Sequence, residues 1–215
     1  MRSTRPVLLG YPLRATAPSR LACTPMPDDA LHEVLQRPAC AACERAANAG
    51  RQYLRGVLGD GVNDVQVRGV WRRDGGLCAA HWRVWRALES PPLPTAILLY
   101  DLLGAHLDAP AARPACPACA VATKEAGRTL RALSRLRPAA LDAALAGDAR
   151  GFLCLEHLAE LPQGAVRERF TARLRALRDE LAEAIRKADY RFATEPAGPE
   201  ADAWLRAIRA YGGDV

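Results

Sequence analysis

RPACAAC at residues 37–43 recurs as RPACPAC at residues 113–119, an offset of 76 positions. A second pair of words has the same offset at its chemical positions. GLCAAHW at residues 76–82 is matched by GFLCLEHL at residues 151–158, with one extra residue before the cysteine. An internal repeat constrains the whole fold more strongly than any single helix or strand does. We therefore expect a duplicated protein whose two copies face each other.

Eight residues that commonly bind metals stand at corresponding positions of the two copies. In each copy a Cys-x-x-Cys pair is followed, after 35 positions, by a Cys-x-x-His pair. The members are Cys40, Cys43, Cys78 and His81 in the first copy, and Cys116, Cys119, Cys154 and His157 in the second. Three cysteines and one histidine are a usual ligand set for structural zinc. The sequence predicts two zinc ions, each bound by the four ligands of one copy.

The residues around these pairs fit tight turns at helix starts. Proline before the first cysteine, at Pro38 and Pro114, disfavours helix in the residue that precedes it. Pro117 suits the first position of a helix. Gly76 and Gly151 precede the second pair, where we expect the backbone to approach the ion closely. Two alternatives stay open: an iron–sulfur cluster, and buried free cysteines without metal.

Helical patterns cover most of the chain, so the predicted fold class is all-α, a duplicated helical repeat with each copy closed by a Cys3His metal site. The divisions are an N-terminal arm (1–37), two zinc-binding repeats (38–113 and 114–191) and a C-terminal helix (192–215). The expected helices are 43–59, 64–71, 81–88, 97–107 capped by Thr95, 120–136, 138–146, 154–161, 165–190, and a last one presenting Trp204, Leu205 and Ile208.

Composition restricts the function classes. The chain has 215 residues, a net charge of +6 and no run of 18 apolar residues, so no transmembrane helix is expected. The pI of about 9.2 raises the possibility of nucleic-acid binding, but the charge is spread along the chain without a basic tail. No secretory signal is evident, and cysteines in such a chain favour metal or redox chemistry in the cytoplasm.

The paired motifs resemble those of an uncharacterised bacterial family, a domain of unknown function with C-P-x-C and G-[FL]-C-x-x-H motifs. The resemblance spans roughly residues 38–190 and includes the word VND at 62–64. Ala41 departs from it, because the family has proline there; Pro117 agrees with it. The resemblance implies a helical zinc-binding fold and no particular activity.

Three hypotheses for function follow. The first is a non-enzymatic scaffold or regulatory module that binds another protein, since no hydrolase triad, phosphate loop or HExxH motif occurs. His32 is interpreted as a surface residue, and His106 as a side chain that caps the C-terminal end of an apolar helix. The second is a nucleic-acid-binding protein. The third is a thiol redox sensor, in which the unpaired Cys23 resolves oxidised zinc thiolates. An enzyme with an unrecognised site also stays open, and Trp82, Trp85 and Trp204 are expected in the core.

Overall fold

The computed structural model describes residues 28–88, 92–109, 115–147, 150–192 and 194–212, and within them the fold is all-α with no strand. Cys23 and most of the predicted arm lie outside these residues. None of the helices described is both long and apolar enough to span a membrane. Ten α-helices and three short 3-10 turns make up the regular structure of this part of the chain.

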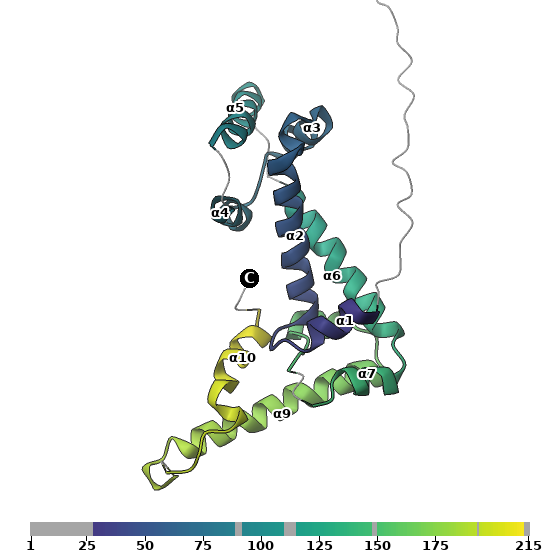
Figure 1. The fold of residues 1–215 in the computed structure, drawn as a ribbon, viewed down its shortest axis with the longest axis vertical. Helices are drawn as coiled ribbons and strands as arrows, with labels where there is room; N and C mark the ends of the chain where they lie inside the picture. The colour runs from purple at the N-terminus through teal and green to yellow at the C-terminus, as the bar shows by residue number, and fades with distance from the viewer. Residues whose placement is uncertain (1–27, 89–91, 110–114, 148–149, 193, 213–215) are drawn as a thin grey trace, which may run out of the picture.

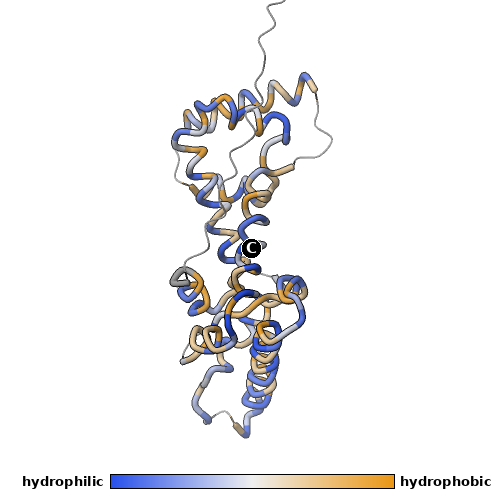
Figure 2. The backbone as a smooth tube through the Cα atoms, turned by 90° about the vertical axis from the view of Figure 1, so that its right-hand side faces the viewer, coloured by the Kyte–Doolittle hydropathy of each residue, from blue (hydrophilic) through white to orange (hydrophobic). Residues whose placement is uncertain are grey.

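Two helices of equal length form the spine of the molecule. Helix α2 (Ala41–Gly59) and helix α6 (Pro117–Arg135) each have 19 residues and lie side by side along most of their length. They run in opposite directions (Figure 1), as shown by contacts between Arg45 and Glu125 and between Gly50 and Ala118. Figure 2 shows that the other helices gather in two lobes along the long axis.

The first lobe, called the α3–α5 lobe, contains η1 (Gly61–Asn63), α3 (Val65–Asp74), α4 (Ala79–Ala87) and α5 (Pro92–Asp108). Asp64 caps α3 by accepting hydrogen bonds from the backbone N–H groups of Gln66 and Val67, and Gly75 ends it in the left-handed conformation. Its core is built on three tryptophans in edge-to-face contact, Trp71, Trp82 and Trp85.

The second lobe, called the α7–α10 lobe, contains α1 (Asp28–Leu35), α7 (Pro138–Ala144), α8 (Leu155–Glu160), α9 (Ala165–Lys187), η2 (Tyr190–Phe192), η3 (Pro199–Asp202) and α10 (Ala203–Ala210). Phe170 and Leu177 bury the inner face of α9 in its core. Helix α1 lies within the segment expected to be an arm, and its Leu31, Val34 and Leu35 are buried in the same core.

Each lobe uses residues from both halves of the chain. The core of the α7–α10 lobe includes Cys40, Ala41 and Ala42 from the start of α2. The core of the α3–α5 lobe includes Cys116 and Ala118 from the start of α6. The antiparallel α2–α6 pair therefore delivers the Cys-x-x-Cys pair of one half to the lobe built by the other half.

Two expectations on individual residues need correction. Thr95 does not begin a helix, because α5 starts at Pro92; instead the Thr95 hydroxyl accepts a hydrogen bond from the Trp85 indole at 3.1 Å. Trp204 does not fill the core: it is 55% exposed, because α10 packs its alanines against the lobe and turns its large apolar side chains outward. Trp85 is buried as expected, and Trp82 is partly buried.

Candidate metal centres

All four cysteine turns have one construction. The first cysteine of each pair is the N-cap of a helix, and the second ligand is the third residue of that helix. The N-caps are Cys40 of α2, Cys78 of α4, Cys116 of α6 and Cys154 of α8. The carbonyl of each N-cap accepts the first helical hydrogen bond, at 2.8–3.2 Å. This geometry turns both side chains of a pair toward the space in front of the helix.

A helix start is a favourable place for a thiolate. The N-terminus of a helix has the positive end of its macrodipole, which stabilises nearby negative charge and lowers the pKa of a thiol. The local sequence produces these starts: proline opens α6 at Pro117, and Gly75 and Gly76, both with positive φ, end α3 just before Cys78. The sequence prediction of turns at helix starts is confirmed here.

The first group of donors, called the outer site, consists of Cys40, Cys43, Cys154 and His157. The Cys43 and Cys154 sulfurs are 3.7 Å apart. The Nδ1 atom of His157 lies 3.1 Å from the sulfur of Cys154, 3.3 Å from that of Cys43 and 3.6 Å from that of Cys40. All four donor atoms lie within 4.8 Å of one another.

The second group, called the inner site, consists of Cys78, His81, Cys116 and Cys119. Here the Cys78 and Cys119 sulfurs are 3.7 Å apart. The Nδ1 atom of His81 lies 3.3 Å from the sulfurs of Cys78 and Cys119 and 3.5 Å from that of Cys116. The two sites thus have the same donor set and nearly the same dimensions.

These distances are those of ligands around one ion. A tetrahedral zinc with Zn–S near 2.3 Å and Zn–N near 2.0 Å separates two sulfurs by roughly 3.8 Å and a sulfur from a nitrogen by roughly 3.5 Å. A disulfide is excluded for the measured pairs, because 3.7 Å far exceeds the S–S bond length of about 2.05 Å. Each group could therefore hold a metal ion.

The predicted grouping of the ligands within each repeat is wrong. The order of the motifs predicts that Cys40 and Cys43 join Cys78 and His81, whereas the structure joins them to Cys154 and His157. The same eight residues converge, but each site takes its Cys-x-x-Cys pair from one predicted repeat and its Cys-x-x-His pair from the other. The reason is the antiparallel α2–α6 pair, which places the start of each helix in the lobe of the opposite half.

Backbone hydrogen bonds fix this exchange. At the outer site Ala41 N–H donates to the Phe152 carbonyl at 3.0 Å, and Phe152 N–H donates to the Ala39 carbonyl at 3.2 Å, forming a parallel bridge at Cys40. At the inner site Ala115 N–H donates to the Asp74 carbonyl at 2.8 Å. In both places a backbone hydrogen bond joins the residues beside a Cys-x-x-Cys pair to the segment that leads into a Cys-x-x-His pair.

Two glycines allow close approaches at the sites. A Cβ on Gly50 would lie 3.2 Å from Nε2 of His81, so the bare glycine of α2 leaves room for the imidazole that presents Nδ1 to the thiols. A Cβ on Gly151 would lie 2.3 Å from the Leu35 carbonyl oxygen. Gly151 is thus required as expected, but for contact with backbone of α1 rather than with an ion. Gly50 was not singled out by sequence, where it is only a glycine inside a predicted helix.

The donors compete with one another for protons. Contacts with Cys154 and then Cys40 raise the pKa of His157 to about 10. Burial, followed by contacts with Cys78 and Cys116, raises the pKa of Cys119 to about 12. Three thiolates this close repel each other. Each of the two sites therefore keeps protons on some of its donors until a cation neutralises the negative charge. Metal binding at these sites must therefore release protons.

The thiol of Cys78 shows the opposite shift. Its burial acts to raise its pKa, but the His81 backbone N–H and imidazole outweigh this effect and lower the pKa to about 6. The N–H belongs to the helix start that Cys78 caps. One thiol of the inner site is therefore prepared for ionisation near neutral pH, which favours initial capture of a metal cation.

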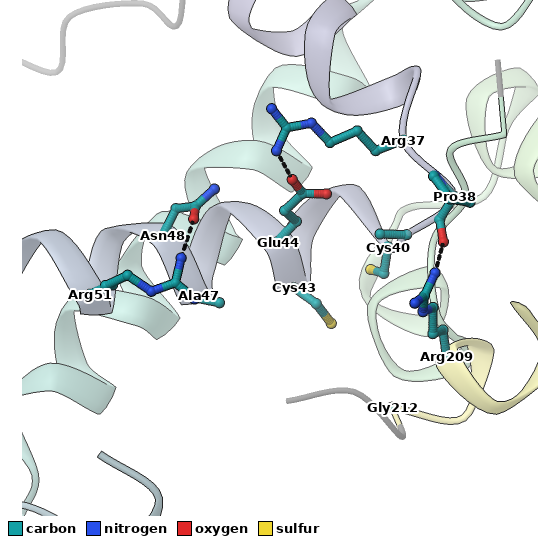
Figure 3. A pocket seen from close by; sticks show the side chains of 11 residues that line it. Arg37, Pro38, Cys40, Cys43, Glu44, Ala47, Asn48, Arg51, Arg209 and Gly212 are labelled. Carbon is teal, nitrogen blue, oxygen red and sulfur yellow. Dashed lines mark hydrogen bonds and ion pairs between the residues drawn. The ribbon is translucent and has the colours of Figure 1, made fainter. Parts of the chain in front are cut away.

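A cavity of about 480 Å³ lies beside the outer site (Figure 3). Cys40 and Cys43 line it, together with Arg37, Glu44 and Arg51. The guanidinium of Arg209 in α10 donates to the Pro38 carbonyl at 3.1 Å across this region, which ties α10 to the turn that leads into the site.

The remaining histidines lie apart from both sites. His32 is exposed on α1, 3.3 Å from the Gln36 amide, and His106 is exposed in the last turn of α5. Comparison of the chain with protein-family models, curated proteins and solved structures finds no match.

Proposed function

We propose that this protein is a non-enzymatic cytoplasmic scaffold or regulatory protein-binding module stabilised by two structural zinc ions. The observation that supports it is the geometry of the two donor groups, each with three sulfurs and one imidazole nitrogen within 4.8 Å of one another. Four protein ligands leave a tetrahedral zinc no open position for water or substrate, which is the mark of a structural site.

Zinc fits these groups better than an iron–sulfur cluster. In a cluster the ligands bind different iron atoms and are spread around its body. Here the donors close around a single point, and tetrahedral sites rich in thiolate favour zinc or a single iron. With three thiolates, a neutral imidazole and Zn²⁺, each site would have a net charge of −1, next to two helix N-termini that stabilise it.

The zinc ions would join the two halves of the chain. The outer site connects residues more than 110 positions apart, and the inner site connects the start of α4 to the start of α6. A metal cross-link between such distant segments would supply part of the folding free energy of each lobe. We also propose that the repeats 38–113 and 114–191 arose by duplication. Corresponding N-caps support this, with φ/ψ of −70°/163° at Cys78 and −63°/164° at Cys154.

An exposed face on α10 supports a role in binding a protein. Trp204 is 55% exposed and Tyr211 82%, and Leu205 and Ile208 lie between them on the same side of the helix. Tryptophan and tyrosine are the residues that contribute most to protein interfaces. A specific partner from the cytoplasm should form a stoichiometric complex that Trp204→Ser abolishes and that Ile185→Ser, at an isolated exposed position of α9, leaves intact.

Metal analysis tests the central claim. Elemental analysis of the purified protein should find about two zinc per chain, as the donor count requires, and the ultraviolet–visible spectrum should show no absorption in the visible range. A brown protein containing iron and sulfide would overturn the zinc assignment in favour of electron transfer or redox sensing.

The basic pI suggests nucleic-acid binding, but the structure gives this function little support. Several arginines on α9 and α10 are paired with carboxylates, including Arg169 with Asp142 and Arg206 with Glu180. Such pairs neutralise the positive charge that would contact phosphates. A gel-shift assay at low salt checks this alternative, and tight binding that weakens steeply with salt would revive it.

The redox alternative rests on the cavity beside the outer site, because Cys43 lines it and is only partly buried. A thiolate there would attack an entering peroxide, which is reduced to water, and the oxidised sulfur would release the zinc. Release of one zinc per chain by moderate peroxide, reversed by a thiol reductant, would favour a sensor over a scaffold.

A further inference from the structure

Helix α5 is apolar on both sides although only one side packs on the lobe. Leu98 is buried, and Asp101 and Leu102 are partly buried beside it. On the opposite side large apolar side chains face outward. These are Leu93 (68% exposed), Ile97 (36%), Tyr100 (84%), Leu103 (61%) and Leu107 (80%).

Helical geometry places the exposed residues on one face. At 100° per residue, positions 93, 96, 97, 100, 103, 104 and 107 fall within roughly 120° of the helix circumference. The face contains no charged side chain from Leu93 to Leu107. The one charged residue in that span, Asp101, lies toward the lobe and pairs with Arg72 at 3.0 Å.

The exposed area is that of an interface. With roughly 200 Å² for a whole leucine, isoleucine or tyrosine residue, the five large side chains of this face expose about 650 Å². The largest apolar patch of a typical monomer is about 300–600 Å². A specific interface buries about 600–1,000 Å² on each partner. The face of α5 is therefore large enough to hold a stable complex.

We propose that this face of α5 is the contact of a symmetric dimer, in which two copies of the helix pack antiparallel about Tyr100. In that arrangement position 93 faces 107, position 97 faces 103, and position 96 faces 104. Leucine then meets leucine, and isoleucine meets leucine. Ala96 meets Gly104, two small residues that let the helix axes approach closely.

A second copy fits better than a charged partner. An isologous interface must be self-complementary. The two copies are related by a two-fold rotation, so each residue i that contacts residue j has a second contact of j with i. An uncharged face meets this condition without placing like charges opposite each other. An acidic or basic peptide would find no ion-pair partner along the face from Leu93 to Leu107. The dimer adds an interface distant in sequence from α10 and leaves the face of α10 available to another protein.

The glycines of the chain provide a matched test. Gly104 in α5 and Gly56 in α2 are both exposed and helical, and a Cβ at either position would meet no atom within 4 Å. Gly104→Glu and Gly56→Glu are therefore the same change at two permissive sites. Only the first places a carboxylate in the proposed contact. Tyr100→Glu provides a second disruption at the centre of the face.

Light scattering coupled to size exclusion measures the outcome on the full zinc-loaded chain. At roughly 100 µM wild type and Gly56→Glu should have twice the monomer mass of 23.2 kDa. Gly104→Glu and Tyr100→Glu should run as monomers, with dissociation constants raised at least about 100-fold and unchanged helical circular dichroism.

Two results would overturn the proposal. One is a monomeric wild type at every concentration, as expected if residues 1–27 or a different protein cover α5. The other is a dimer that both α5 variants leave intact. Because zinc content is measured on the same samples, failure of the dimer is distinguished from failure of the metal sites.

Discussion

Cys43 and Cys154 place their sulfur atoms 3.7 Å apart although they are 111 positions apart in the chain. Their contact establishes that the first Cys-x-x-Cys pair meets the last Cys-x-x-His pair. The inner site, from Cys78 to Cys119, lies entirely within the sequence interval that the outer site closes. The two centres are nested, not consecutive.

Paired cysteine variants distinguish the two groupings. Cys43→Ser with Cys154→Ser removes two ligands from the outer site and leaves the inner site whole, so one tightly bound zinc per chain should remain. Cys43→Ser with Cys78→Ser removes one ligand from each site, so no zinc should resist a competing chelator. Elemental analysis after chelator treatment measures both. If each site used the four ligands of one repeat, Cys43→Ser with Cys78→Ser would leave one zinc, and Cys43→Ser with Cys154→Ser would leave none.

Loss of one site should affect the lobe to which it belongs. Cys154→Ser should loosen the α7–α10 lobe, since Cys154 lies in its core, and leave the three-tryptophan core of the α3–α5 lobe protected. Structural zinc supplies folding free energy on the order of 10 kcal/mol in small domains, so the loss should be large. Hydrogen exchange with mass spectrometry resolves the lobes. Equal loosening of both would contradict separate cores.

Gly50→Val should weaken zinc binding at the inner site alone. A Cβ at Gly50 already approaches Nε2 of His81 to 3.2 Å, and the two methyl groups of valine would push the imidazole from its position. Groups that orient a ligand typically change metal affinity by about 10- to 100-fold. Chelator competition should release one of the two zinc ions earlier than in wild type. Gly56→Val, in open space on the same helix, should leave both unchanged.

Gly151→Ala should destabilise the protein strongly. Its Cβ would lie 2.3 Å from the carbonyl oxygen and 2.7 Å from the Cα of Leu35. These are backbone atoms, so a change of side-chain rotamer cannot relieve the clash. The expected loss is about 3 kcal/mol in the free energy of unfolding, at the upper end of overpacking costs. Chemical denaturation measures it. Gly56→Ala should instead stabilise helix α2 by about 0.5–1 kcal/mol, which controls for the residue type.

Glu200 should make the attachment of α10 sensitive to acid. Its carboxylate accepts hydrogen bonds from Lys187 at 2.7 Å and from the Gly198 N–H at 2.8 Å, which lower its pKa from 4.5 to about 2. The stabilisation is complete above pH 4.5 and is lost as pH falls toward 2. The stability difference between wild type and Glu200→Gln should shrink through that window.

An NMR titration of the Glu200 carboxyl carbon checks the origin of this effect. Lys187→Gln should move the midpoint up toward 4.5, because Lys187 is the largest cause of the shift. A midpoint near 4.5 in the wild type would show that the contact with Lys187 does not persist in solution.

The residues of the two candidate metal sites could be predicted from sequence, and their grouping could not. Cys-x-x-Cys and Cys-x-x-His fix the local geometry, because residues three apart at a helix start point to the same side. Because each motif occurs twice in the sequence, however, each Cys-x-x-Cys pair has two equivalent Cys-x-x-His pairs to meet. The choice is made by the α2–α6 packing, a contact between segments that no local pattern specifies.

The bounds of the long helices could be predicted from hydrophobic periodicity. The packing of the short helices could not. Helices α2, α6 and α9 lie close to the predicted ranges. Helix α1 has only eight residues and gains its order from burying Leu35 against distant parts of the chain, which sequence alone does not reveal. Trp204 was expected inside because it is large and apolar, but its position on α10 is set by the alanines on the opposite side.

The nested order of the ligands also sets a sequence of events during synthesis. As the chain leaves the ribosome, Cys78, His81, Cys116 and Cys119 are all available once residue 119 has emerged, so the inner centre can close first. Cys40 and Cys43, although made earliest, must wait for His157. A nascent chain arrested before that point would display two unpaired thiols at the start of α2.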